Sequence, residues 1–262
     1  MPLGPVVVLA PLLVLLLCAA PSLQEPIFLP AGVTANLFKG LPQLPVLNES
    51  AGETRSVYYH DQIVAVVDLA QPRRLLHCEL VEVYEPSEAE EILKNLSTIL
   101  TPHRTSFKDM IKLMEKCDKL DEHPGRPKPI SYSNSEKSNT GNPLLAGIVP
   151  GTKWCGTGDI ARSYHDLGSR SKVDRCCRAH DLCPVKIRAY KSRYNLVNNS
   201  FFSKSHCTCD ETFFQCLKSI NHVSATIMGN IYFNIAQPPC IEDGSSPPQN
   251  DVKKFVPVKR QF

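Results

Sequence analysis

Apolar and polar positions alternate most clearly in the first half of the chain. Residues 56–69 (SVYYHDQIVAVVDL) and 73–85 (RRLLHCELVEVYE) are rich in β-branched and aromatic side chains, and a short break at Gln71-Pro72 separates them. Such runs are typical of strands. The pattern therefore predicts a pair of strands over residues 56–85.

Two stretches after these strands repeat apolar residues at helical spacing. In residues 87–100 (SEAEEILKNLSTIL), Ser87 and Glu90 have the spacing of a capping box, which marks the start of a helix. Residues 106–120 (SFKDMIKLMEKCDKL) show the same helical periodicity. Together with the strands, these helices predict a small α+β segment.

Two further helices are predicted in the second half of the chain. The first has the body RCCRAHDLC, residues 175–183, which Asp174 is placed to cap and Pro184 to end. The second runs from about Asp210 to residue 231, with apolar residues at positions 213, 214, 217, 220 and 227.

Cysteines at equal intervals predict that these two helices are cross-linked. Cys176 and Cys183 are seven residues apart, and so are Cys209 and Cys216. Seven residues are almost two helical turns, so each pair lies on one face of its helix. Two disulfides between the helices fit an antiparallel pairing, and a parallel pairing fits the same spacing. In both cases His180 lies on the cross-linked side.

The first 22 residues predict a secretory signal peptide. An apolar run from Val6 to Ala20 carries no charged side chain, and small residues at Ala20-Pro21-Ser22 indicate cleavage nearby. The run is shorter than the ~20 residues that a membrane-spanning helix needs, which argues against an anchor. We therefore expect a secreted, extracellular protein with no transmembrane segment in its mature form.

Secretion decides how the cysteines are interpreted. The chain has 11 cysteines, and ten remain once Cys18 leaves with the signal. An even number in an oxidising compartment favours disulfides over zinc ligands or redox thiols. Cys78 and Cys117 are placed to pair with each other in the first half. Three N-x-S sequons agree with a secreted glycoprotein, at Asn48, Asn95 and Asn198.

Charge and composition divide the chain near residue 148. Residues 123–147 are rich in Pro, Ser, Asn and Gly and predict a linker. Residues 148–262 hold 16 Lys and Arg against 9 Asp and Glu, a net charge of +7, and the remaining 13 against 17 give −4. This asymmetry suits an acidic prosegment that masks a basic domain, or two folded domains that differ in charge. We expect a signal peptide at 1–22, an N-terminal segment that is a candidate propeptide at 23–122, and a linker at 123–147. A C-terminal domain at 148–240 and a flexible basic tail at 241–262 follow.

The stretch CCRAHDLCP, residues 176–184, places His180 and Asp181 next to each other among three cysteines. Thiolates and an imidazole suit zinc, but secretion argues against it. The alternatives are an incidental histidine in a disulfide scaffold and an active site. No serine or free cysteine stands in an obvious position to be a nucleophile, so in an active site His180 would activate water. The histidines of the first half are interpreted as surface or packing residues, at positions 60, 77, 103 and 123.

A glycine-containing loop upstream is a candidate metal site. In WCGTGD, residues 154–159, Trp154, Gly156 and Gly158 alternate, and glycine lets the backbone turn successive carbonyl oxygens inward. Carbonyls and one carboxylate, for which Asp181 is the candidate, make the oxygen site that calcium prefers. A histidine and a carboxylate beside calcium would hydrolyse an ester, because the metal polarises the carbonyl and stabilises the oxyanion.

Four stretches together resemble the group III, bee-venom-type secreted phospholipase A2 family: IVPGTKWCGTGD, CCRAHDLCP, CTCDETFFQCL, and IYFN followed by Cys240. The similarity covers about residues 148–240 and keeps the spacing of eight cysteines. It implies a mainly α, disulfide-rich phospholipase A2 domain with two antiparallel cross-linked helices, preceded by the small α+β N-terminal segment. It also implies the disulfides Cys155–Cys177, Cys176–Cys216, Cys183–Cys209 and Cys207–Cys240.

The resemblance implies a role for each residue of the candidate site. His180 would be the general base that deprotonates water, Asp210 would hydrogen-bond the far nitrogen of the ring, and Tyr232 would support Asp210. Calcium would be bound by the carboxylate of Asp181 and by the backbone carbonyls of Trp154, Gly156 and Gly158. The Gly156 amide would complete the oxyanion site.

The resulting hypothesis is a secreted, calcium-dependent phospholipase A2 that hydrolyses the sn-2 ester of glycerophospholipids to a free fatty acid and a lysophospholipid. The alternative is a catalytically weak homologue that binds membranes or a receptor, and the intact His180, Asp181 and Asp210 argue against it. The expected partner is a phospholipid surface, not nucleic acid. Basic residues near the site in the sequence are candidates to face anionic lipid, namely Lys153, Arg162, Arg170, Lys172, Arg175 and Arg178. The chain departs from the family in having no cysteine after Cys240 for a further C-terminal disulfide.

Overall fold

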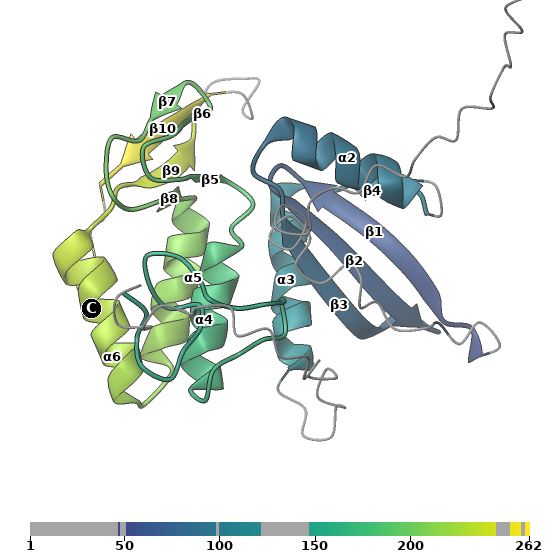
Figure 1. Ribbon diagram of the computed structural model, residues 1–262, viewed down its shortest axis with the longest axis horizontal. Helices are drawn as coiled ribbons and strands as arrows, with labels where there is room; N and C mark the ends of the chain where they lie inside the picture. Colours follow the sequence, from purple (N-terminus) through teal and green to yellow (C-terminus); the bar gives the residue numbers. More distant parts are fainter. Residues whose placement is uncertain (1–46, 48–50, 98–99, 122–146, 245–251, 258–259) are drawn as a thin grey trace, which may run out of the picture.

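The computed structural model describes residues 47, 51–97, 100–121, 147–244, 252–257 and 260–262. They form an N-terminal unit built on a sheet and a C-terminal unit of helices and short strands, which lie side by side (Figure 1). The predicted signal peptide, the sequon at Asn48 and the predicted linker up to residue 146 lie outside the described residues. Within the described ranges, no helix has the length and apolar character needed to cross a membrane.

The N-terminal unit contains a mixed four-stranded sheet in the order β3-β2-β1-β4. Antiparallel pairing joins β1 (Thr54–His60), β2 (Ile63–Ala70) and β3 (Arg74–Glu82), and β4 (Pro102–Arg104) pairs with β1 in parallel. The sequence predicts a single strand where β1 and β2 lie. The chain instead turns at Asp61, whose φ of 47° is a left-handed conformation that aspartate adopts more readily than most residues.

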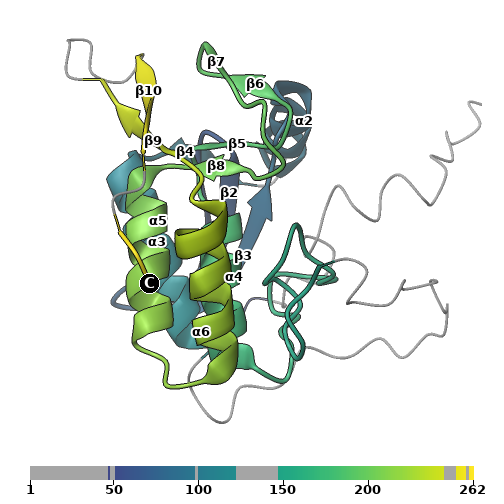
Figure 2. The ribbon, with the colours of Figure 1, turned by 90° about the vertical axis from the view of Figure 1, so that its left-hand side faces the viewer.

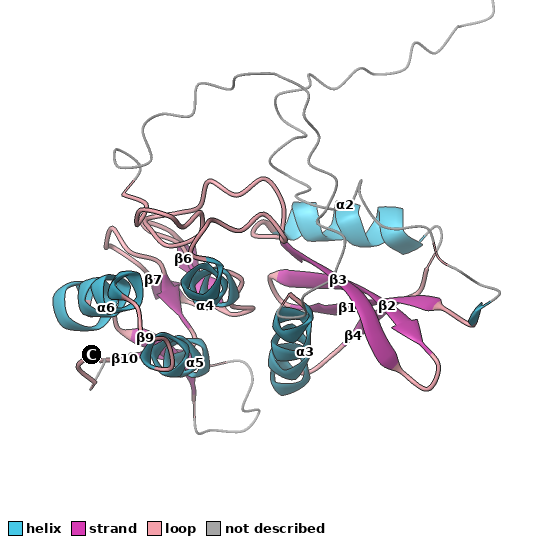
Figure 3. Ribbon diagram, turned by 90° about the horizontal axis from the view of Figure 1, so that it is seen from below, coloured by secondary structure: helices cyan, strands magenta, loops and turns pink. Residues whose placement is uncertain are grey.

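Helices cover both faces of this sheet. Successive residues of a strand point to opposite faces, so Val64 packs in the apolar cluster of α2 (Pro86–Ser97), whereas Ala65 packs in that of α3 (Phe107–Leu120). Seen from below, α2 and α3 lie on either side of the strands (Figure 3). The central strand β2 is therefore buried on both faces.

A disulfide and a helix cap stabilise α3 in the N-terminal unit. The disulfide Cys78–Cys117 ties β3 to α3, as the positions of these two cysteines suggested. Ser106 caps α3, because its hydroxyl accepts from the backbone N–H of Asp109 at 3.1 Å.

The capping box predicted at Ser87 and Glu90 does not form. The carboxylate of Glu88 accepts from the backbone N–H groups of Tyr84 and Glu85 at 3.1 and 3.2 Å instead. A neighbouring acidic residue thus supplies the acceptor that the first turn of the helix needs.

Two cross-linked helices form the centre of the C-terminal unit, α4 (Ser171–Asp181) and α5 (Cys207–Lys218). They run antiparallel, because Cys176 in the middle of α4 is joined to Cys216 near the end of α5, whereas Cys183 just after α4 is joined to Cys209 near the start of α5. The four disulfides of this unit join the same cysteines that the family resemblance pairs: Cys155–Cys177, Cys176–Cys216, Cys183–Cys209 and Cys207–Cys240.

The single helix predicted from Asp210 to residue 231 is interrupted. After α5 ends, a second helix α6 (Val223–Gly229) begins, followed by a π-helical stretch η3 (Asn230–Ala236). A ring nitrogen of His222 caps α6 by accepting from the N–H of Ser224 at 3.0 Å. Figure 2 shows that α6 packs back along α5, which brings η3 to the side of the cross-linked pair.

Three short antiparallel pairs complete the C-terminal unit: β5 (Lys186–Ile187) with β8 (Lys204–Ser205), β6 (Ser192–Arg193) with β7 (Leu196–Val197), and β9 (Cys240–Asp243) with β10 (Lys253–Val256). The flexible tail expected at 241–262 therefore differs from the structure, since part of it is paired in β9 and β10 and Phe262 packs against Phe233.

The sequon at Asn198 is closed to glycosylation in this fold. Asn198 is 0% exposed. Its side-chain amide donates to the carbonyls of Ile187, Arg188 and Phe202 at 3.2, 3.1 and 2.8 Å. The sequon alone could not distinguish this buried, structural asparagine from a glycosylation site.

The two units share one apolar core. It runs from the sheet through Met110 and Met114 of α3 to Val173 of α4 and Leu217 of α5. The acidic side chains of the N-terminal unit pair with basic side chains of the C-terminal unit around this core, as Asp61–Arg193 (2.6 Å), Glu82–Lys186 (2.8 Å), Glu82–Arg188 (2.9 Å), Asp118–Arg178 (2.8 Å) and Asp121–Arg178 (2.7 Å).

Arg178 is the most enclosed of these cations, with 0% of its surface exposed. Its guanidinium also donates to the carbonyl of Tyr164 at 2.8 Å. Burial opposes the ionisation of Asp121, but the hydrogen bond from His165 and the charge of Arg178 lower the pKa of Asp121 to about 2.

Replacement of Arg178 by methionine should destabilise the fold strongly. Arg178→Met keeps the apolar stem but leaves Asp118 and Asp121 without their buried counter-charge, and breaking a buried pair typically costs about 3–5 kcal/mol. Urea unfolding of the oxidised protein measures the loss. The matched control Arg162→Met removes an exposed partner of Asp166 and should cost less than about 1 kcal/mol. Equal losses for both variants would contradict the role given to Arg178.

Candidate active site

His180 projects from the last turn of α4 toward α5. Its Nε2 donates to Oδ1 of Asp210 at 2.7 Å. Phe213 stacks on the imidazole with ring centroids 4.5 Å apart, and Tyr232 meets it edge-on at 5.0 Å. The ring is therefore held in one orientation by a hydrogen bond and two aromatic contacts.

Tyr232 of η3 reaches the same carboxylate oxygen from the other side. Its hydroxyl donates to Oδ1 of Asp210 at 2.9 Å, and Asp210 is buried. Burial, with the nearby charge of Asp210, raises the pKa of Tyr232 well above its usual value, so the phenol remains a donor. Because Nε2 of His180 is used by Asp210, the other ring nitrogen is the one available to a ligand, and it has no hydrogen-bond partner among the described residues.

Asp174 has a different role from the one the sequence suggested. It was expected to cap α4, but α4 begins at Ser171 without a side-chain cap. The buried carboxylate of Asp174 instead accepts from the backbone N–H groups of Lys153 (2.9 Å), Trp154 (2.8 Å) and Gly168 (2.7 Å). With the disulfide Cys155–Cys177, this carboxylate fixes the candidate metal loop to α4.

The backbone of this loop alternates in its hydrogen bonding. The carbonyls of Lys153 and Cys155 accept from Ile160 and Val149, each at 2.8 Å. In the part of the chain that the structure describes, no backbone N–H donates to the carbonyls of Gly156 and Gly158. Among the described residues, the backbone hydrogen bonds of the loop therefore leave the carbonyls of Gly156 and Gly158 unused.

Only one of the two glycines is required by packing. A Cβ on Gly156 would lie 2.5 Å from Cδ1 of Ile148 and 2.8 Å from the carbonyl oxygen of Gly147. A Cβ on Gly158 would meet nothing within 4 Å. Gly156 therefore allows the close backbone approach that shapes the loop.

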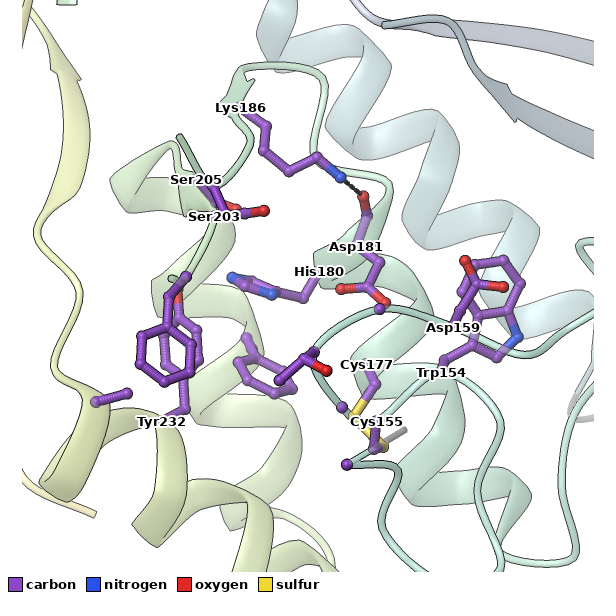
Figure 4. A pocket seen from close by; sticks show the side chains of 18 of the residues that line it. Trp154, Cys155, Asp159, Cys177, His180, Asp181, Lys186, Ser203, Ser205 and Tyr232 are labelled. Atoms are coloured by element: carbon purple, nitrogen blue, oxygen red, sulfur yellow. Dashed lines mark hydrogen bonds between the residues drawn. A yellow bond between two sulfur atoms is a disulfide. The ribbon is translucent and has the colours of Figure 1, made fainter. Parts of the chain in front are cut away.

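Asp181 lies beside His180 and faces the same space as the loop (Figure 4). Burial raises the pKa of Asp181 well above its usual value; Lys186 opposes this rise, and Asp159 adds to it. A carboxylate in this setting is stabilised by a cation next to it. The all-oxygen donor set of loop carbonyls and one carboxylate fits a hard ion such as calcium.

These groups line one cavity of about 480 Å³. Its walls include the predicted residues Trp154, Gly156, Gly158, His180, Asp181 and Tyr232, and Asp210 lies behind His180. The structure therefore brings together all the residues that the sequence assigned to the candidate site.

The cavity also has a wall that sequence reasoning missed. Glu82 of β3, in the N-terminal unit, holds Lys186 (2.8 Å) and Arg188 (2.9 Å) at the rim, and Lys186 also donates to the backbone carbonyl of Asp181. Although burial opposes it, these two cations lower the pKa of Glu82 below its usual value. No local signal could have found this contact, because about 100 residues separate its partners in the sequence.

The basic residues expected to face lipid do not form one surface. Arg178 is buried against Asp118 and Asp121, and Arg175 approaches Asp118 at 3.8 Å. The cations of Lys153 and Arg162 both pair with Asp166. Arg170 and Lys172 are exposed at the start of α4. Acidic neighbours thus neutralise most of this cluster.

Comparison with known proteins gives the family. A family model described as phospholipase A2 matches residues 148–244. A phospholipase A2 of Bombus terrestris is 43% identical over 94 residues, which are 36% of this chain and 69% of that protein. A phospholipase A2 of Xylocopa appendiculata circumvolans is 40% identical over 93 residues, 36% of this chain and 52% of that protein.

A group 3 secretory phospholipase A2 of Bos taurus is 42% identical over 92 residues, 35% of this chain and 18% of that protein. The chain therefore belongs to the phospholipase A2 family, and its C-terminal part is of the group III, bee-venom type. This confirms the resemblance inferred from the sequence motifs.

Proposed function

We propose that the protein is a secreted, calcium-dependent phospholipase A2, which hydrolyses the sn-2 ester of glycerophospholipids to a free fatty acid and a lysophospholipid. The observation that carries this proposal is the hydrogen-bonded series Tyr232–Asp210–His180, which leaves one imidazole nitrogen available beside Asp181 and the loop. Membership of the phospholipase A2 family supports the substrate class.

The hydrogen bonds of His180 support a role as general base. With Nε2–H donating to Asp210, the lone pair of Nδ1 accepts a proton from a water molecule as the water oxygen adds to the ester carbonyl carbon. The same nitrogen then returns that proton to the departing glycerol oxygen as the ester C–O bond breaks. The two products carry the oxygen and both hydrogens of the water.

Asp210 and Tyr232 position the base and do not contact the substrate. The carboxylate of Asp210 fixes the tautomer of His180 and stabilises the imidazolium that forms during proton transfer. The hydroxyl of Tyr232 holds this carboxylate in place at 2.9 Å. Stacking of Phe213 limits rotation of the ring, so the base remains directed into the cavity.

The residues that would hold calcium are Asp181 and the carbonyls of Trp154, Gly156 and Gly158. When bound, the ion supplies a positive charge that polarises the ester carbonyl and stabilises the oxyanion. The N–H of Gly156 is the candidate donor to that oxyanion. Asp174 and the disulfide Cys155–Cys177 keep the loop in position for both tasks.

An apolar face near the cavity supports contact with a membrane surface. Side chains at every fourth position of α6 and η3 are exposed, and Phe201 and Phe202 are exposed at the cavity rim. The helical residues are Val223, Ile227, Ile231 and Ile235. We infer that this face contacts the bilayer and that lipid reaches His180 from it. The basic cluster, most of which is neutralised by acidic neighbours, does not have this role. The five disulfides and the secretory relative support an extracellular location.

The first test is fatty-acid release from phospholipid vesicles, with calcium and then with a chelator. His180→Gln should lower turnover by about 10²–10⁴-fold, because water lacks its positioned base. The matched control His103→Gln changes an exposed histidine of β4 and should retain full activity. Full activity of a correctly folded His180→Gln protein would exclude the mechanism, and an inactive wild type would favour the binding-module alternative.

The calcium site is tested separately from turnover. Asp181→Asn preserves shape but removes the one carboxylate assigned to the ion, so calcium binding should weaken by about tenfold or more, equal to about 1.4 kcal/mol. Isothermal titration calorimetry measures the change. Asp243→Asn, on the β9–β10 pair and outside the cavity lining, is the control and should bind calcium as the wild type does. Unchanged affinity in the Asp181 variant would place the ion elsewhere.

The membrane face is tested with two exposed residues. Phe201→Ser and Ile235→Ser, at side chains 79% and 77% exposed, should each weaken binding to phosphatidylcholine vesicles by about tenfold or more, since burial of such a side chain contributes about 1.5–3 kcal/mol. Hydrolysis of a monomeric short-chain lipid should not change in Ile235→Ser, whose side chain does not line the cavity. Val252→Ser, exposed near β10, is the control. If all three variants bind vesicles equally well, the assigned face is wrong.

A further inference from the structure

A group of metal-binding side chain types lies where the two units meet, away from the cavity. His77 and Glu79 are two residues apart on β3, so they point to the same side of the strand. His165 reaches them from the segment before α4. Nε2 of His77 lies 3.8 Å and Nε2 of His165 lies 3.5 Å from Oε2 of Glu79, and the three ligand atoms are within 4.8 Å of one another.

Glu79 is an acidic residue buried between the two units. It is 3% exposed, and its Oε1 has no hydrogen-bond partner among the described residues. Burial raises the pKa of Glu79 to about 7, although the charges of His165 and Arg178 oppose the rise. The ionised form of a carboxylate desolvated in this way is stabilised by a cation in contact with it. The nearby guanidinium of Arg178 is already paired with Asp118 and Asp121.

One ring nitrogen of His165 has the carboxylate partner that metal-binding histidines usually have. Its Nδ1 lies 3.1 Å from Oδ1 of Asp121, and a carboxylate that accepts from one ring nitrogen fixes the ring and makes the other nitrogen a better ligand. Nε2 lies 2.8 Å from the carbonyl oxygen of Cys78. Both atoms that face the ring, Oδ1 of Asp121 and the carbonyl oxygen of Cys78, are hydrogen-bond acceptors.

We infer that His77, Glu79 and His165 bind a divalent zinc ion. Two imidazoles and one carboxylate are a common zinc ligand set, with water in the fourth position. Zinc bonds of about 2.0–2.1 Å place tetrahedral ligand atoms roughly 3.3–3.4 Å apart, close to the separations from Glu79. Binding of zinc through Nε2 of His165 replaces the contact of this nitrogen with the carbonyl oxygen of Cys78. Calcium is not expected here because nitrogen ligands suit zinc and carbonyl oxygens suit calcium.

The ligands of this site come from both units. His77 and Glu79 belong to the sheet, and His165 belongs to the family domain, so a bound ion would join the two beside the Arg178 ion pairs. This site is independent of the proposed phospholipase activity, because none of its residues lines the 480 Å³ cavity.

The test is titration of the full-length protein with zinc chloride by calorimetry, after treatment with a chelator and with calcium in excess. We expect one zinc ion per chain, and His77→Ala and His165→Asn should each weaken binding by about 10–100-fold or more. The matched control His103→Ala alters an exposed histidine of the same unit and should bind zinc as the wild type does. Circular dichroism confirms that each variant is folded.

Two further measurements separate this site from other histidines. Cobalt in place of zinc should give the visible absorption of a tetrahedral site in the wild type, and this signal should be lost in His77→Ala, whose side chain lies at the edge of the cluster. His180→Gln should keep both signals. The inference is overturned if folded wild-type protein binds no zinc, or if zinc binding survives in His77→Ala and is lost in His180→Gln.

Discussion

The two disulfides between α4 and α5 hold the arrangement on which the candidate site depends. His180 and Asp210 are 30 residues apart in sequence, and their 2.7 Å contact exists because covalent cross-links on either side of His180 fix the distance between the helices. The same α4 carries Asp181, the loop anchor Asp174 and Cys177. One short helix thus orients His180, the candidate calcium carboxylate and the carbonyl loop together.

The opposite side of α4 faces the N-terminal unit. Arg178 lies there between Asp118 and Asp121, only two residues from His180. The charge asymmetry of the sequence suited a masking prosegment or two folded domains. In the structure the N-terminal unit is folded around its own sheet, and its carboxylates meet particular cations of the family domain, with an apolar core continuous between them.

Much of the candidate site could be predicted from the sequence because its chemistry is encoded in short spacings. The seven-residue cysteine intervals, the His180-Asp181 pair and the alternating loop all depend on local geometry, and the structure places them together. Features set by tertiary contacts could not be predicted in this way. Asp174 has the sequence pattern of a helix cap but accepts from a distant loop, and Asn198 has the pattern of a sequon but serves as a buried hydrogen-bond donor. The turn at Asp61 and the helix start at His222 lack the Gly or Pro that usually marks a chain reversal.

The net charge at the entrance of the cavity depends on Glu82, which belongs to the N-terminal unit. Lys186 and Arg188 belong to the family domain, but the carboxylate that balances them is supplied by the sheet. A cut in the segment between the units, followed by loss of the sheet, would remove one negative charge from the rim and leave two positive charges there. An anionic group approaching the rim would then meet a more attractive field, and a cationic group a less attractive one. The charge at the rim is therefore set jointly by the two units, although His180 and Asp210 both belong to one of them.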